Sequence, residues 1–271
     1  MGIVDRMVHN VASQDGLSGK RVVVTGGTKG IGAGIAARLA GAGASVLVAA
    51  RSAPERELPA NVRFVKADLS TESGVAGLAA EALEILGGVD VIVDNAGGAV
   101  PATSGIADLT EEHWHDAYQL NVMAAVRLDR ALLPGMLERG SGVIIHISSI
   151  AALRAESSLV HYGAAKAALN AYSKSLATEV APRGVRVNRI APGLIKTEAV
   201  DSFVQHIQDT QGLDQEAALG TLHELVGGIP AGREGKPADI ANVVAFLASD
   251  QAEWIVGAEF RIDGGSVRQV S

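Results

Sequence analysis

The 271-residue sequence contains no cysteine and very few aromatic residues. Without cysteine, the chain can form neither a disulfide framework nor a cysteine-ligated metal site. Aromatic residues make up only 3% of the chain although 48% of it is hydrophobic, so the core must be built from Ala, Val, Leu and Ile. The formal net charge of −7 argues against a nucleic-acid-binding surface, which usually shows as a basic patch.

Long uncharged apolar runs are absent from the sequence as well. No run approaches the roughly 18 residues that a membrane-spanning helix needs. Residues 1–19, which precede the first predicted strand, carry several charged side chains and lack the apolar core of a signal peptide. We therefore expect a soluble, cytoplasmic protein with a short N-terminal extension over residues 1–19.

Apolar runs rich in β-branched residues alternate with helical segments along the chain. The predicted strands are Arg21–Thr25, Ser45–Ala50, Val62–Ala67, Val89–Val93, Gly142–Ile147, Val185–Ile190 and Glu259–Ile262. The predicted helices are Ile31–Gly41, Glu72–Leu86, Thr110–Glu138, Val160–Val180 and Pro237–Ser249. Strand–helix repetition with apolar strands predicts a single α/β domain over residues 20–271, a Rossmann-like, doubly wound sheet of about seven parallel strands. Ligands bind such a sheet at the carboxyl ends of its strands.

A glycine-rich turn follows the first predicted strand, in the stretch Thr25-Gly26-Gly27-Thr28-Lys29-Gly30-Ile31-Gly32. Glycines at a strand-to-helix turn let the backbone approach a pyrophosphate, and the helix N-terminus supplies oriented N–H groups. The spacing differs from the G-x-G-x-x-G fingerprint. We interpret the turn as a dinucleotide-binding loop, with a purely structural turn as the alternative.

The end of the second predicted strand indicates which dinucleotide binds. A carboxylate there would hold the ribose 2′-hydroxyl of NAD, but the position carries Ala50, followed by Arg51 and Ser52. A guanidinium suits a 2′-phosphate instead, and Lys29 in the glycine-rich turn lies where it could converge on the same group. Two cations and no anion favour NADP(H) over NAD(H), unless both cations simply face solvent.

Tyr162 and Lys166 lie four residues apart on a predicted helix, and Ser149 precedes the tyrosine by 13 residues. Positions i and i+4 share a helix face, so the ammonium can lie beside the phenol. A neighbouring cation favours the phenolate and would let the tyrosine exchange a proton near neutral pH. The spacing alone is common on helices, so its meaning depends on the rest of the chain.

Residues 194–233 depart from the strand–helix rhythm and contain several glycines and Pro230. The segment begins at a predicted carboxyl end of a strand, which favours a pair of short helices that form a lid over the site. A surface insertion without a role is the alternative. Trp254 is expected to lie in the core, and Arg154 and Glu156 are expected either to touch substrate or to face solvent.

Taken together, the motifs resemble the short-chain dehydrogenase/reductase family over roughly residues 20–266. The shared motifs are Thr25–Gly32, Asp68-Leu69, Asn95-Ala96-Gly97, Asn121, Ser148-Ser149, Tyr162-x-x-x-Lys166, Asn188, Pro192-Gly193-x-x-x-Thr197 and Asp263-Gly264-Gly265. The family more often has Asn-Asn-Ala-Gly where this chain has Asp94 in the first position, and that difference is expected to change hydrogen bonding within the sheet.

The resemblance implies roles for individual residues. Tyr162 would be the acid/base, Lys166 would hold the nicotinamide ribose and lower the tyrosine pKa, Ser149 would bind the substrate oxygen, and Asn121 would anchor a water in a proton relay. The cofactor contacts would come from Gly26, Thr28, Lys29, Gly30, Ile31, Arg51, Ser52, Asp68, Leu69, Asn95, Ala96, Gly97, Tyr162, Lys166, Pro192, Gly193, Ile195 and Thr197. No metal is expected, since His113 and His115 at i and i+2 do not share a helix face.

The sequence thus predicts an NADP(H)-dependent oxidoreductase that interconverts a ketone and a secondary alcohol. Two alternatives stay open: a 3-oxoacyl-carrier-protein reductase, and a dinucleotide-binding protein without catalysis. The resemblance also implies a homotetramer or a homodimer, with interfaces built from helices Thr110–Glu138 and Val160–Val180. The predicted substrate loops are 98–106, 150–159 and 194–228, and their mostly apolar content fits many small ketones.

Overall fold

A single parallel β-sheet forms the centre of the computed structural model, which describes residues 16–98, 105–154 and 157–269. Within these residues the strands are β1 (Arg21–Thr25), β2 (Ser45–Ala50), β3 (Val62–Lys66), β4 (Val91–Asp94), β5 (Gly142–Ile147), β6 (Val185–Pro192) and β7 (Glu259–Ile262). Their order is β3-β2-β1-β4-β5-β6-β7, and every neighbouring pair is parallel. This confirms the doubly wound fold predicted from the apolar runs.

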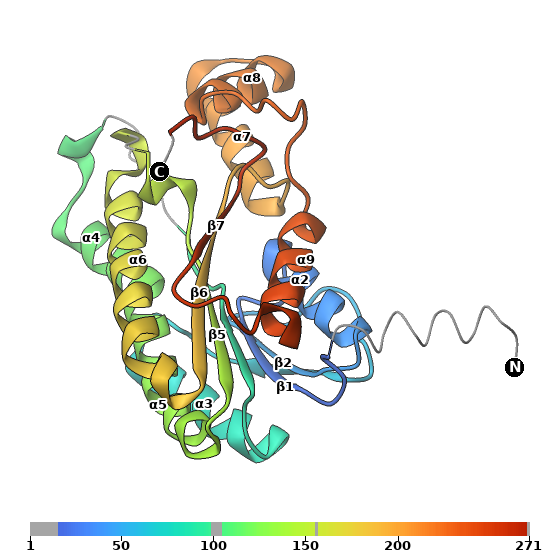
Figure 1. Cartoon of the computed structure of the whole chain (residues 1–271). Helices are drawn as coiled ribbons and strands as arrows, with labels where there is room; N and C mark the ends of the chain where they lie inside the picture. The colour runs from blue at the N-terminus through green and yellow to red at the C-terminus, as the bar shows by residue number, and fades with distance from the viewer. Residues whose placement is uncertain (1–15, 99–104, 155–156, 270–271) are drawn as a thin grey trace, which may run out of the picture.

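Helices cover both faces of the sheet, as Figure 1 shows. The α-helices of the described residues are α2 (Gly30–Gly41), α3 (Glu72–Leu86), α4 (Glu111–Tyr118), α5 (Ala124–Arg139), α6 (Val160–Val180), α7 (Glu198–Gln211), α8 (Gln215–Leu225) and α9 (Pro237–Ala248). Short 3₁₀ turns are η1 (Ile106–Asp108), η3 (Ile150–Ala152), η4 (Ser157–Leu159), η5 (Ala181–Arg183) and η6 (Asp250–Ala252). One cluster of apolar side chains joins α2 and α9 to one face, and a second joins α3, α5 and α6 to the other.

Side chains alternate between these two clusters along each strand, because successive residues of a strand point to opposite faces. On β1, Val22 and Val24 belong to the α2/α9 cluster, whereas Val23 belongs to the α3/α5/α6 cluster. Among the described residues, the fully buried hydrophobic side chains include no Phe, Tyr or Trp, and small residues let the helices come close. A Cβ on Gly34 of α2 would lie only 2.7 Å from the Cβ of Pro237 at the start of α9.

The helix predicted over Thr110–Glu138 contains an interruption that the sequence pattern did not reveal. Thr110 caps α4, and its side chain accepts a hydrogen bond from the backbone N–H of His113. Between α4 and α5 lies one wide, π-helical turn, η2 (Gln119–Met123), which contains Asn121. Such turns insert an extra residue into a helix and are frequent at functional sites.

The segment over residues 194–233 folds into α7 and α8, which pack against each other through their own apolar cluster. In Figure 1 they stand above the carboxyl end of the sheet. Trp254 contradicts the expectation of a core position, since its side chain is 97% exposed. Among the described residues, no helix is long and apolar enough to cross a membrane.

Parts of three predicted features lie outside the described residues. They are most of the N-terminal extension (residues 1–15), residues 99–104 of the first predicted substrate loop, and Glu156 with its neighbour at 155. The other predicted site residues are all described.

Candidate active site

The glycine-rich turn between β1 and α2 takes a conformation that only glycine accommodates easily. Gly26 and Gly30 have φ angles of 65° and 52°, in the left-handed region. A side chain on Gly32 would collide with the backbone carbonyl of Gly26 and with the amide of Asn95. The turn thus brings bare backbone to the N-terminus of α2, where phosphate groups are favoured.

Asn95 and Thr25 tie this turn to the end of β4. The Asn95 side-chain amide donates hydrogen bonds to the carbonyls of Thr25 (2.9 Å) and Gly26 (3.2 Å). In return, the Thr25 hydroxyl accepts from the backbone N–H groups of Asn95 and Ala96, both at 2.9 Å. These bonds cross two adjacent parallel strands and hold the glycine-rich turn at a fixed position.

A groove of about 580 Å³ runs along the carboxyl ends of the strands. Its lining includes twelve of the predicted cofactor residues: Gly26, Lys29, Gly30, Ile31, Asn95, Ala96, Gly97, Tyr162, Lys166, Pro192, Gly193 and Thr197. The size and the glycine-lined floor fit an extended ligand with phosphate groups. The structure therefore brings together the phosphate end and the reactive end of the predicted cofactor site.

Six predicted cofactor residues do not line this groove: Thr28, Arg51, Ser52, Asp68, Leu69 and Ile195. Thr28 lines a neighbouring cavity instead. Leu69 and Ile195 are buried in the core, where their apolar side chains pack with the strands and helices. Arg51 and Ser52 are exposed at the end of β2. Hydrogen bonds from Ser70 lower the pKa of Asp68, and the charge of Arg51 contributes to the same shift.

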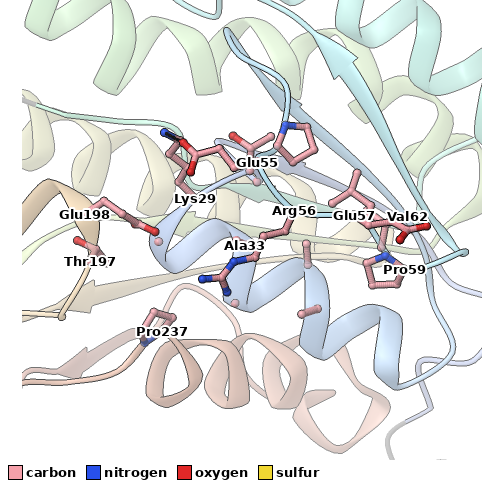
Figure 2. Close-up of a pocket in the computed structure, with 18 of the residues that line it drawn as sticks. Lys29, Ala33, Glu55, Arg56, Glu57, Pro59, Val62, Thr197, Glu198 and Pro237 are labelled. Atoms are coloured by element: carbon pink, nitrogen blue, oxygen red, sulfur yellow. Dashed lines mark hydrogen bonds and ion pairs between the residues drawn. The ribbon is translucent and has the colours of Figure 1, made fainter.

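Lys29 forms an ion pair that the sequence did not predict. Its Nζ lies 2.7 Å from Oε1 of Glu55, in the loop after β2. Both side chains line a cavity of about 550 Å³ beside the groove, and Figure 2 shows them at its end near Thr197 and Glu198. The hydrogen bond and charge of Glu55 raise the pKa of Lys29, with a smaller contribution from Glu198. A phosphate that binds Lys29 therefore competes with a carboxylate.

Tyr162 and Lys166 both lie in the first two turns of α6, as the i, i+4 spacing predicts. The Lys166 Nζ is 5.8 Å from the centre of the Tyr162 ring and donates a 2.9 Å hydrogen bond to the carbonyl of Ile147. Burial lowers the pKa of Lys166 to about 8, opposed by the charge of Asp94. An ammonium this deeply buried exerts a strong field on the polar groups around it.

The expected lowering of the Tyr162 pKa does not occur in this structure. Burial raises the pKa of Tyr162, and the hydrogen bond with Ser149 opposes that shift. Desolvation penalises the phenolate, and the ammonium of Lys166 is directed at the Ile147 carbonyl. The phenol is consequently protonated at neutral pH, which is the form that donates a proton.

The two adjacent serines after β5 have different surroundings. The Ser148 hydroxyl donates to Oδ1 of Asn170 at 2.6 Å, which directs it toward α6. The Ser149 hydroxyl bonds to Tyr162 and also accepts from the backbone N–H of Ala151 at 3.1 Å. Ser149 is therefore the serine whose hydroxyl lies beside the tyrosine phenol.

Asn121 lies in the wide turn of the α4–α5 helix and is buried. Its side-chain amide donates to the carbonyls of Gly98 and Ala117, both at 2.9 Å, and its Oδ1 accepts from the N–H of Gly98 at 3.1 Å. A Cβ on Gly97 would lie within 2.7 Å of the Asn121 Oδ1 and 3.0 Å of the Lys166 Nζ. The side chains of Asn121 and Lys166 thus both approach Gly97 closely, at a place where a larger residue would not fit.

A second cavity, of about 540 Å³, opens from Tyr162 toward α7 and α8. Ser149, Tyr162 and Gly193 line both this cavity and the groove, so the two spaces meet at the tyrosine. Most of its other walls are apolar: Ile150, Ala151, Leu159, Leu194, Ala199, Val200, Phe203, Leu222, Leu225 and Val226. Arg154, Ser202 and His206 provide its further polar groups.

The sequence reasoning missed several residues around the site. Glu55, Ser202 and His206 approach it from loops and helices distant in sequence, and no local pattern marks them. A different missed group is the buried cluster of Asp94, Asp129 and His146, and the charge of Asp94 acts on Lys166. The unusual Asp94 was noticed in the sequence, but its two neighbours in the cluster, Asp129 and His146, come from α5 and β5.

Comparison with known proteins places the chain among dinucleotide-dependent reductases. Residues 26–267 match the model of a family described as Enoyl-(Acyl carrier protein) reductase. The chain is 35% identical to 3-oxoacyl-[acyl-carrier-protein] reductase FabG of Vibrio cholerae serotype O1, over 92% of this chain and 98% of that protein. It is 39% identical to an uncharacterized oxidoreductase of Methylorubrum extorquens, over 92% and 98% of the two chains.

Solved structures show the same similarity. The L-sorbose reductase of Gluconobacter frateurii, in complex with NADPH and L-sorbose, matches with a TM-score of 0.85 and 35% sequence identity. The match covers 94% of this chain and 99% of that one. The fold similarity therefore extends over nearly the whole length of both proteins.

Proposed function

The chain belongs to the short-chain dehydrogenase/reductase family, and we propose that it reduces a ketone to a secondary alcohol with NADPH, with Tyr162 as the proton donor. The observation that carries the proposal is the meeting of the glycine-lined groove and the apolar cavity at Tyr162 and Ser149. A cofactor in the groove and a substrate in the cavity would thus face each other across these two hydroxyls.

NADP(H) is the cofactor that the site fits. Its hydride supplies the reducing equivalents. The glycine-rich turn and the N-terminus of α2 would hold the pyrophosphate, and Lys29 and Arg51 would hold the 2′-phosphate. The end of β2 presents Ala50 in place of the carboxylate that would repel this phosphate and bind NAD. The structural relative bound to NADPH supports the same choice.

The protein's own residues would carry the proton chemistry. The hydroxyls of Ser149 and Tyr162 would donate hydrogen bonds to the carbonyl oxygen of the substrate, which would become negative during its reduction. Tyr162 then gives its proton to form the alcohol. The buried Lys166 ammonium stabilises the phenolate left behind and would bind the nicotinamide ribose, and Asn121 would hold a water that returns a proton.

The apolar cavity supports a ketone with a hydrophobic body as substrate. Its walls offer few hydrogen-bonding groups for a polyol, and α7 and α8 would act as the lid that closes over it. The relatives that reduce 3-oxoacyl groups make the acyl chain of a carrier protein the second candidate substrate. We further propose a cytoplasmic homotetramer or homodimer that associates through the α4–α5 helix and α6.

A substrate panel with NADPH and NADH, combined with Tyr162→Phe, tests this function. The variant should bind NADPH like the wild type but lose about 10²-fold or more in kcat, because phenylalanine cannot donate the proton. Tyr118→Phe, at a more exposed position, is the matched control and should keep full activity. Equal reduction rates for Tyr162→Phe and wild type would refute the proposed role, and no turnover on any carbonyl would favour a binding protein without catalysis.

A further inference from the structure

A buried polar cluster lies between the sheet and helices α5 and α6, close to Lys166. Asp94 ends β4, and His146 is its register partner on β5. Asp129 comes from α5 and Tyr172 from α6. The side chains of Asp94, Asp129 and His146 are all at most 5% exposed. Four elements distant in sequence thus bring two carboxyls, an imidazole and a phenol together in the core.

The hydrogen bonds of this cluster converge on one oxygen. Oδ2 of Asp129 lies 3.0 Å from Nε2 of His146 and accepts a 3.0 Å hydrogen bond from the Tyr172 hydroxyl. Oδ2 of Asp94 lies 3.8 Å from the same imidazole nitrogen. Within the described residues, Oδ2 of Asp94 and Oδ1 of Asp129 have no hydrogen-bond partner. Two buried carboxylate oxygens in the described part of the chain therefore lack a donor, in a cluster where one side-chain atom from each of Asp94, Asp129 and His146 lies within 4.8 Å of the others.

Two carboxyls this close and this buried cannot both be ionised at neutral pH. Burial raises the pKa of Asp94 well above its ordinary value, and the neighbouring carboxyl of Asp129 raises it further. Oδ2 of Asp129 lies within hydrogen-bond distance of both the His146 imidazole and the Tyr172 hydroxyl. The neutral form of the buried Asp94 carboxyl is therefore favoured, because its pKa is raised.

Lys166 is the cation that responds to this ionisation. Its Nζ donates to the carbonyl of Ile147, the residue that follows His146, and its charge acts on Asp94. Burial lowers the Lys166 pKa to about 8, and the charge of Asp94 opposes that loss. Within the described residues, the other titratable groups of the cluster are Asp129 from α5, His146 from β5 and Tyr172 from α6.

We propose that Asp94 and Asp129 share a proton beneath Lys166, and that Asp94 is a positioning residue whose ionisation keeps Lys166 charged as the pH rises. The proposal rests on the proposed function, because Lys166 acts on the reaction through Tyr162. The direction of the effect on the protonation of Lys166 follows from the charges. When Asp94 loses its proton, the new negative charge stabilises the ammonium, so Lys166 stays protonated to a higher pH than it would beside a neutral group.

The pH dependence of kcat in Asp94→Asn tests the proposal. Asparagine has the shape of the protonated carboxyl but cannot ionise. The variant should match the wild type within about twofold below neutral pH, and its loss of activity at alkaline pH should begin at least about 0.5 pH unit lower. Asp90→Asn, just before the first residue of β4, removes a carboxylate from the opposite end of the strand to Asp94 and should leave the alkaline limb unchanged.

An unchanged alkaline limb in Asp94→Asn, with or without a loss of stability, would overturn the proposal and leave Asp94 a purely structural residue. Tyr162→Phe separates this outcome from a failure of the proposed function, because that variant tests the proton donor without touching the cluster.

A second measurement covers the case in which the variant does not fold. Infrared spectroscopy of the wild type should show a protonated carboxyl at neutral pH that ionises over the range where activity falls. Finding every carboxyl ionised at neutral pH would contradict the shared proton. Elemental analysis of the purified protein adds a further check, since a stoichiometric bound divalent metal would make Asp94, Asp129 and His146 a metal site instead.

Discussion

The guanidinium of Arg154 occupies the space that a side chain on Gly227 would fill. Arg154 follows the loop that carries Ser149, and Gly227 lies just after α8. Gly227 also has a φ angle of 81°, which disfavours any other residue. The contact joins the loop that carries Ser149 to the two helices above the apolar cavity.

We expect Gly227→Ala to weaken substrate binding without weakening NADPH binding. The new methyl group would push Arg154 or the end of α8 away and change the cavity wall, so KM for the ketone should rise several-fold. Gly228→Ala is the matched control, because its φ angle is 78° but a Cβ there meets nothing within 4 Å. Equal KM values for the two variants would show that backbone strain alone, not Arg154, is responsible.

Cofactor preference should depend on Lys29, Arg51 and Glu55. Arg51→Ala and Lys29→Ala should each raise KM for NADPH about tenfold with little effect on NADH, since a charge-assisted hydrogen bond to the 2′-phosphate is lost. Glu55→Gln should lower KM for NADPH, because the carboxylate no longer competes for Lys29. Steady-state kinetics with both cofactors measures this.

Glu57→Gln is the control for Glu55→Gln, since it removes a carboxylate from the same loop and cavity without touching the Lys29 ion pair. If both variants change KM for NADPH equally, the effect comes from general charge and not from the ion pair. High salt should reduce all of these differences, because the side chains are exposed.

Acid should weaken the protein through the pair of Asp90 and Arg21. Asp90 accepts three hydrogen bonds from Arg21, from the backbone N–H and two guanidinium nitrogens, at 2.7–3.0 Å. Burial acts to raise the pKa of Asp90, but the hydrogen bonds and charge of Arg21 outweigh it and the pKa is lowered. The resulting stabilisation is therefore present above the ordinary Asp pKa and is lost as the pH falls through the lowered one.

Asp90→Asn should lower the free energy of unfolding at neutral pH by about 1–3 kcal/mol. The difference from the wild type should disappear in strong acid, where the wild-type carboxyl is protonated as well. Urea unfolding of both proteins at neutral and at acid pH measures it. A difference that stays constant with pH would exclude the ion pair as its source.

Asn121→Ala should lower kcat at least about tenfold while NADPH still binds. The substitution removes the three hydrogen bonds that join the wide helical turn to Gly98 and Ala117. Gln119→Ala, in the same turn, is the matched control, because within the described part of the chain its side chain bonds only to Arg127. Stopped-flow measurement of NADPH binding, beside turnover, separates the loss of catalysis from a loss of the site.

Much of the fold followed from local pattern. Buried parallel strands are continuous apolar runs, and β1, β2, β5 and β7 begin and end at the predicted residues. The wide turn at Asn121 escaped prediction because a π-helical turn leaves the helical hydrophobic pattern almost unchanged. Trp254 escaped because hydrophobicity alone cannot show on which side of a short turn a side chain points.

The sequence by itself determined the sheet, the glycine-rich turn and the helix that places Tyr162 beside Lys166, since each depends on residues close together in the chain. Only the tertiary structure decided the electrostatics. Glu55 reaches Lys29, Asp129 and His146 reach Asp94, and burial raises the Tyr162 pKa where a neighbouring cation was expected to lower it. Charge interactions and desolvation depend on distances and burial across elements far apart in sequence, which no spacing along the chain encodes.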